Sequence, residues 1–67
     1  MSKQEYREYF KEKQKRIKIT TFVEELGIPR TTFSLFMNGS DGVLSIARLE
    51  KIKQSIIEYL KTENKDS

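Results

Sequence analysis

The chain has 67 residues, enough for one domain with a small hydrophobic core. It contains neither cysteine nor histidine, which excludes disulfides, removes the commonest metal ligands and removes the commonest general base. The formal net charge is +3, a mild excess that suits a polyanionic partner without requiring one. The composition predicts a protein that is not an enzyme and that uses no metal or other cofactor.

The apolar runs are short, so we expect no membrane-spanning segment and no secretion signal, and a cytoplasmic protein. Seven of the Lys and Arg residues fall within residues 1–18, against one in residues 19–44 and five in residues 45–67. Alternating apolar and polar residues typical of strands are absent, and glycine and proline are few. We therefore expect a single all-α domain over residues 1–67.

A first helix is predicted from about Ser2 to Arg16, because Ser2 and Glu5 have the spacing of a capping box. One face of this helix is apolar and should be buried; it carries Tyr6, Tyr9, Phe10, Ile17 and the aliphatic part of Lys13. A second face is basic and carries Arg7, Lys11, Lys15 and Lys18. This basic face is either simply solvated or in contact with phosphates, and the charge pattern alone leaves both readings open.

A second helix should begin at Thr20 or Thr21, with Thr21 and Glu24 as another capping box. Its inward residues are expected to be Phe22, Val23 and Leu26. Gly27 should end it, since glycine readily adopts the left-handed conformation found after helix ends. Ile28 is then expected to anchor the turn in the core.

A third helix is predicted over residues 30–37, started by Pro29 and stopped by Asn38-Gly39. Phe33, Phe36 and Met37 should face inward, which leaves the small polar residues outside. A long fourth helix should follow Ser45 as N-cap and run to about Thr62, ahead of a frayed polar tail over about 63–67. Its buried face is expected to comprise Leu49, Ile52, Ile56 and Tyr59 or Leu60, with Leu44 packing on Leu49 at the helix start.

Residues of about 19–38 have the pattern of a helix-turn-helix, in which the first helix packs across the second and a tight turn joins them. Relative to Gly27, the apolar residues Phe22, Leu26, Ile28, Phe33 and Phe36 occupy offsets −5, −1, +1, +6 and +9. The segment GIPRTTFSLFMNG, residues 27–39, resembles the turn and recognition helix of the lambda-repressor/Cro-type (Xre-like) DNA-binding family. The resemblance covers roughly residues 17–60.

The resemblance implies a small four-helix or five-helix lambda-repressor-like bundle that inserts its third helix into the DNA major groove. Such a protein is a bacterial or phage transcriptional regulator, repressor-like, and often a homodimer on a pseudo-palindromic operator in double-stranded DNA. The residues implied to contact bases are Arg30, Thr31, Thr32, Ser34 and Leu35. Residues assigned to phosphates, partly from the position of the basic charge, are Arg16, Lys18, Thr20, Thr21, Asn38 and Ser40.

Chemistry supports some of these roles. Arg30 can donate two hydrogen bonds to guanine, whereas Leu35 can meet only a thymine methyl group. Leu35 departs from the family pattern, as does Val23, which is larger than the residue usual at its position. The family also often has a fifth helix, whereas this chain extends its fourth.

A homodimer would use apolar residues of the long helix, and we assign Ile46, Ile57 and Leu60 to it; scattered surface apolar residues are the alternative explanation. No small-molecule ligand is expected, because no second domain is present to bind one. The low positive charge near the third helix predicts a shallow salt dependence for a monomer. It also motivates a competing hypothesis, a protein-interaction module of the phage inhibitor or adaptor type that reuses the same scaffold.

Overall fold

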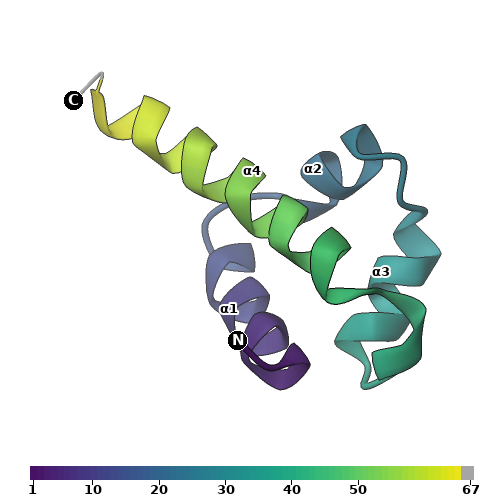
Figure 1. The fold of residues 1–67 in the computed structure, drawn as a ribbon. Coiled ribbons are helices and arrows are strands. Elements are labelled where there is room, and N and C mark those ends of the chain that lie inside the picture. The colour runs from purple at the N-terminus through teal and green to yellow at the C-terminus, as the bar shows by residue number, and fades with distance from the viewer. Residues whose placement is uncertain (66–67) are drawn as a thin grey trace.

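The computed structural model describes residues 1–65 and the side chains of residues 1–62. The elements, in chain order, are α1 (Lys3–Gln14), α2 (Ile19–Glu25), α3 (Arg30–Met37), a 3₁₀ turn η1 (Asp41–Val43) and α4 (Ile46–Lys65), and no strand occurs among the described residues (Figure 1). The predicted all-α class with a long C-terminal helix is confirmed. The long helix ends later than the predicted position of about Thr62, because α4 continues to Lys65, and residues 66–67 of the predicted tail lie outside the described residues.

The first helix begins as its sequence predicts. The Glu5 amide donates to Ser2 Oγ over 3.2 Å and the Ser2 amide donates to Glu5 Oε1 over 2.8 Å, which completes the capping box. Tyr6 and Phe10 are buried, while Tyr9 is half-buried against the core. The helix ends at Gln14, two residues before the predicted end at Arg16.

The start of α2 differs from the prediction. The helix begins at Ile19 with Lys18 as its N-cap, and no side chain caps it, so the Thr21–Glu24 capping box is wrong. The reason is the burial of Ile19, which is 1 % exposed and brings the helix start forward into the core. Leu26 was also wrongly placed inside: it is the C-cap residue and is 39 % exposed.

The short helices α2 and α3 end in turns of the same type. Behind α2, the Ile28 amide donates to the Val23 carbonyl over 3.1 Å; behind α3, the Ser40 amide donates to the Leu35 carbonyl over 3.0 Å. Each is the long hydrogen bond of a Schellman motif, with Gly27 and Gly39 at positive φ of 80° and 117°. The predicted stops at these glycines are confirmed, and so is the burial of Ile28 in the turn.

Phe10 of α1 lies at the centre of the core. Its ring centroid is 5.7 Å from that of Phe33 and 6.5 Å from that of Phe36, so α1 packs directly on the buried side of α3. The core is completed by a set of residues that are each at most 3 % exposed: Tyr6, Phe10, Ile19, Val23, Ile28, Phe33, Phe36, Leu44, Leu49, Ile52 and Ile56. All predicted inward aliphatic residues of α4 up to Ile56 are therefore confirmed.

The long helix α4 contacts both α1 and α2. Its N-cap is Ser45, whose hydroxyl accepts from the Arg48 amide over 3.3 Å, as predicted. Tyr59 is 40 % exposed rather than buried. Its ring lies at the rim of the core and packs edge-on against Phe22, with 5.4 Å between the ring centroids. The last turns of α4 extend past the rest of the bundle (Figure 1). Within the described residues, no helix has both the length and the apolar character that crossing a bilayer requires.

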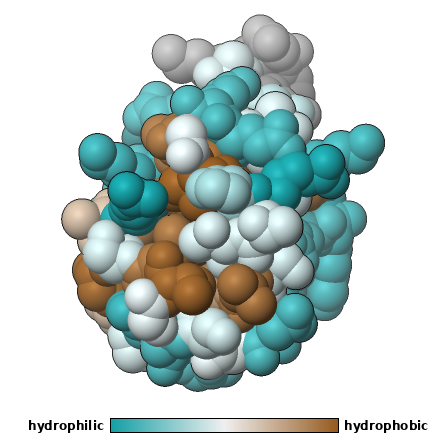
Figure 2. All heavy atoms as spheres, turned by 90° about the vertical axis from the view of Figure 1, so that its right-hand side faces the viewer, coloured by the Kyte–Doolittle hydropathy of each residue, from teal (hydrophilic) through white to brown (hydrophobic). Residues whose placement is uncertain are grey.

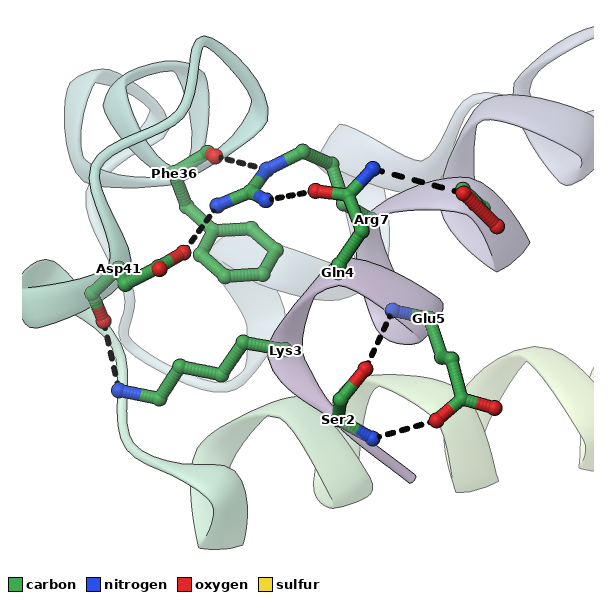
Figure 3. Close-up of polar contacts among 8 residues, drawn as sticks. Ser2, Lys3, Gln4, Glu5, Arg7, Phe36 and Asp41 are labelled. Atoms are coloured by element: carbon green, nitrogen blue, oxygen red, sulfur yellow. Dashed lines mark hydrogen bonds and ion pairs between the residues drawn. The ribbon is translucent and has the colours of Figure 1, made fainter.

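Arg7 is the clearest correction to the sequence analysis. Predicted on an exposed basic face, it is only 7 % exposed. Its Nε donates to the Phe36 carbonyl over 2.7 Å, and its two terminal nitrogens bind Gln4 and Asp41 (Figure 3). The guanidinium carbon also lies 4.5 Å from the centre of the Phe36 ring. Arg7 therefore joins α1 to the end of α3 and is not available to a phosphate.

Candidate nucleic-acid interface

The outer face of α3, which we define as Arg30, Thr31, Ser34 and Leu35, is exposed along its whole length. The opposite side of the helix is seated in the core by Phe33 and Phe36. Thr32, also predicted to contact bases, is half-buried at the edge of this face. The structure thus brings four of the five predicted base-contacting residues together and turns the fifth partly inward.

Arg30 has a partner that the sequence analysis missed. Its Nε lies 3.1 Å from Glu24 Oε1, which links the start of α3 to α2. Both side chains are more than half exposed, so this ion pair is worth at most about 1 kcal/mol. Glu24 nevertheless places a negative charge directly beside the outer face of α3.

A surface hollow of about 380 Å³, here called the α3 hollow, opens beside this face. It is lined by Gln14, Thr20, Arg30, Thr31, Phe33, Ser34 and Met37. Thr20, predicted to contact a phosphate, therefore lies next to the predicted base-contacting residues. Gln14 was missed; its position in the last turn of the basic first helix was the available signal. Met37, predicted to be core, is half-buried and forms part of the hollow.

Three further residues assigned to phosphates meet at a second hollow of about 340 Å³, here called the α2 hollow. Arg16, Lys18 and Thr21 line it together with Ile17, Phe22 and Tyr59. The adjacent residues Thr20 and Thr21 thus open onto different hollows. The positive charge of the loop between α1 and α2 is concentrated beside the start of α2.

Asn38 and Ser40 lie at the other end of α3, and both are exposed. Their loop is held on two sides by α1: Arg7 binds Asp41 Oδ1, and Lys3 Nζ donates to the Asp41 carbonyl over 2.6 Å (Figure 3). Asp41, read from sequence as ordinary loop chemistry, is the residue through which α1 fixes this loop. The predicted phosphate contacts therefore do not form one group, because Thr20 lies beside α3, three others lie at the α2 hollow, and Asn38 and Ser40 follow the end of α3.

Apolar side chains are also exposed on this side of the molecule. Figure 2 faces the side on which α3 lies in Figure 1 and shows apolar surface among polar side chains. On and around α3, Leu35 is 50 % exposed, Leu26 39 % and Val43 36 %. The face is therefore not purely polar, which matters for the kind of partner it suits.

The three residues predicted for a dimer surface have different environments. Ile46 is 45 % exposed at the start of α4, and Ile57 is half-buried. Leu60 is half-buried and packs against the core of its own chain. Only Ile46 presents a largely free apolar side chain, so the predicted surface is less apolar than the sequence pattern indicated.

Within the described part of the chain, no three acidic side chains lie close enough together to hold a metal ion. A hydrogen-bonded pair of titratable side chains lies away from α3, between α1 and α4. Tyr6 Oη donates to Glu50 Oε1 over 2.8 Å. Hydrogen bonds from Gln54 and Tyr6 lower the pKa of Glu50, and the bond to Glu50 raises the pKa of Tyr6. This pair joins α1 to α4 and has a structural role.

Comparisons with protein-family models, with curated proteins and with solved structures gave no match for this chain.

Proposed function

We propose that this chain binds double-stranded DNA sequence-specifically by placing the outer face of α3 in the major groove. The observation that carries the proposal is the division of α3 into two sides. Phe33 and Phe36 are at most 2 % exposed, whereas Arg30, Thr31, Ser34 and Leu35 face outward. A helix seated on the core by one side presents its other side to base edges in the major groove, where Arg30 can donate to guanine and the Thr31 and Ser34 hydroxyls can bond to bases.

The surroundings of α3 support the proposal. Arg16, Lys18 and Thr21 meet at the α2 hollow, where they suit one strand of phosphates. Asn38 and Ser40, which follow the last turn of α3, suit phosphates at that edge of the groove. With Arg7 committed to the protein interior, the cations left for DNA are few, so affinity for non-specific DNA should be modest.

On this proposal the protein is a small cytoplasmic regulator of the lambda-repressor/Cro-type (Xre-like) class, from a bacterium or a phage. It would act as a homodimer on a pseudo-palindromic operator. Two copies double the phosphate contacts and the base contacts, which offsets the low charge of one chain. Ile46 is the residue of the proposed dimer surface most exposed for such a contact.

The direct test is fluorescence anisotropy with a random duplex pool at low and moderate salt, followed by selection of the preferred sequence. We expect binding at low salt, and Thr31→Ala or Ser34→Ala should weaken binding to the selected sequence more than to the pool. Lys18→Ala should weaken both and reduce the salt slope by about 1. Lys61→Ala, which removes the same charge from the far part of α4, is the matched control and should leave the slope nearly unchanged.

A second candidate function is a protein-interaction module, favoured by the exposure of Leu35, Leu26 and Val43. The two candidates differ in the anisotropy titration. No binding to the pool at low salt would rule out DNA recognition and leave the interaction module. Sedimentation of the protein alone tests the dimer, and a monomer at high micromolar concentration that also binds DNA as a single copy would contradict it.

A further inference from the structure

The outer face of α3 offers methyl groups where a recognition helix needs contacts with bases. Thr31 and Leu35 are four residues apart in one helix, so their side chains are neighbours on the same face. Leu35 is 50 % exposed, although burial would be favourable for such a side chain. The hydrogen-bonding groups of this face are the hydroxyls of Thr31 and Ser34 and the Arg30 guanidinium, and the guanidinium is already paired with Glu24.

A base edge that meets the Leu35 side chain and the Thr31 methyl group therefore meets apolar surface. In the major groove the group that matches it is the C5 methyl of thymine, since the other edge groups there are hydrogen-bond donors and acceptors. A donor or acceptor pressed against Leu35 would lose water without gaining a partner, which is unfavourable. Leu35 thus favours a methylated pyrimidine at the position it reaches and disfavours an unmethylated base edge.

We propose that Thr31 and Leu35 recognise the C5 methyl groups of pyrimidines, so that the DNA half-site bound by one chain depends on thymine methyls. This inference rests on the proposed function, because it names what the same face of α3 recognises in the duplex. Burying one methyl group changes affinity roughly fourfold. The chain should therefore distinguish thymine from uracil, and 5-methylcytosine from cytosine, although each pair has the same hydrogen-bonding groups.

The experiment uses the duplex selected from the random pool, with each thymine replaced in turn by deoxyuridine. We expect replacement of at least one thymine in each half-site to weaken binding roughly fourfold, as anisotropy at fixed salt would measure. In Leu35→Ala or in Thr31→Ser, which removes a methyl and keeps the hydroxyl, one such replacement should cost nothing further. A duplex with 5-methylcytosine at the same position should bind about fourfold more tightly than the duplex with cytosine there.

Leu26→Ala is the matched control, because it shortens a leucine that is 39 % exposed at the end of α2, outside the outer face of α3. This variant should keep the full sensitivity to uracil, and circular dichroism of all variants establishes that they fold. Equal binding of the thymine and uracil duplexes by the wild-type chain would overturn the inference. Unchanged uracil sensitivity in both Leu35→Ala and Thr31→Ser would also overturn it. In either case DNA binding itself would stand, whereas failure to bind any duplex at low salt would refute the proposed function.

Discussion

Arg7 Nε donates a hydrogen bond to the Phe36 carbonyl over 2.7 Å across 29 positions of sequence. This carbonyl belongs to the last turn of α3 and also accepts from the Gly39 amide over 3.0 Å, so Arg7 is a second donor to it from outside the helix. The arginine therefore acts as a cap delivered by another helix, and its positive charge is favourable beside the negative end of the α3 dipole. It also stacks on the ring of the residue whose carbonyl it binds.

Arg7→Met should lower the free energy of unfolding by about 1–3 kcal/mol, because it keeps most of the packing but removes the charged donor to the Phe36 carbonyl, Gln4 and Asp41. Urea denaturation followed by circular dichroism would measure the change. Asp41→Asn should cost at most about 1 kcal/mol, since the Asp41 side chain is 65 % exposed. A loss in Asp41→Asn as large as that in Arg7→Met would show that the ion pair, not the carbonyl contact, is what matters.

The two glycines that end α2 and α3 should be needed for their conformation and not for space. A Cβ atom at Gly27 or Gly39 would have no atom within 4 Å, yet φ is 80° and 117° there. Gly27→Ala and Gly39→Ala should each cost about 1 kcal/mol in unfolding free energy. Gly42→Ala is the control, because that site is equally open and its φ is not positive; a comparable loss there would argue against conformation as the cause.

The features that sequence could predict are local ones. Ser2 with Glu5, Gly27, Asn38-Gly39 and Ser45 each fix a helix boundary through neighbouring residues, and each boundary formed as predicted. The start of α2 could not be predicted in this way, because the burial of Ile19 in the tertiary core outweighs a local capping signal.

Long-range contacts explain the remaining differences between the predicted and the observed candidate site. Arg7 has the sequence position of an exposed cation, and only the fold brings Asp41 and the Phe36 carbonyl to it. Glu24 and Gln14 likewise approach α3 from other helices. The outer face of α3 was predictable because helical periodicity alone separates it from Phe33 and Phe36.

Glu24→Gln should strengthen DNA binding several-fold at low salt, with little effect on stability. The substitution removes a negative charge beside the proposed phosphate contacts and leaves Arg30 free to reach a base. Anisotropy titrations at low and high salt would measure this gain, which should shrink as salt rises. Glu25→Gln is the matched control, because it removes the same charge from an α2 residue that lines a hollow with α4 and not with α3. Equal gains from the two variants would mean that net charge alone is responsible.

The Tyr6–Glu50 hydrogen bond should make the stability of the fold fall in acid. The pKa of Glu50 is lowered from 4.5, so its contribution is complete above that value and is lost as the pH falls through the lowered pKa. Tyr6→Phe should therefore be less stable than the wild type at about pH 6, and the difference should narrow towards about pH 3. Urea denaturation across this range measures it. Glu50→Gln still accepts a hydrogen bond but does not titrate there; a Tyr6→Phe penalty that narrows equally in the Glu50→Gln background would contradict Glu50 as the cause.

The attachment of the Asn38–Asp41 loop to the first turns of α1 has a consequence for motion. Lys3 and Arg7 hold this loop from a helix whose terminal turn is the part of any helix most prone to opening. Whenever the first two turns of α1, which carry Lys3 and Arg7, unwind together, the loop after α3 loses both anchors at once. Amide hydrogen exchange in the first two turns of α1 and in this loop should therefore rise and fall together, although the two segments are more than 30 residues apart.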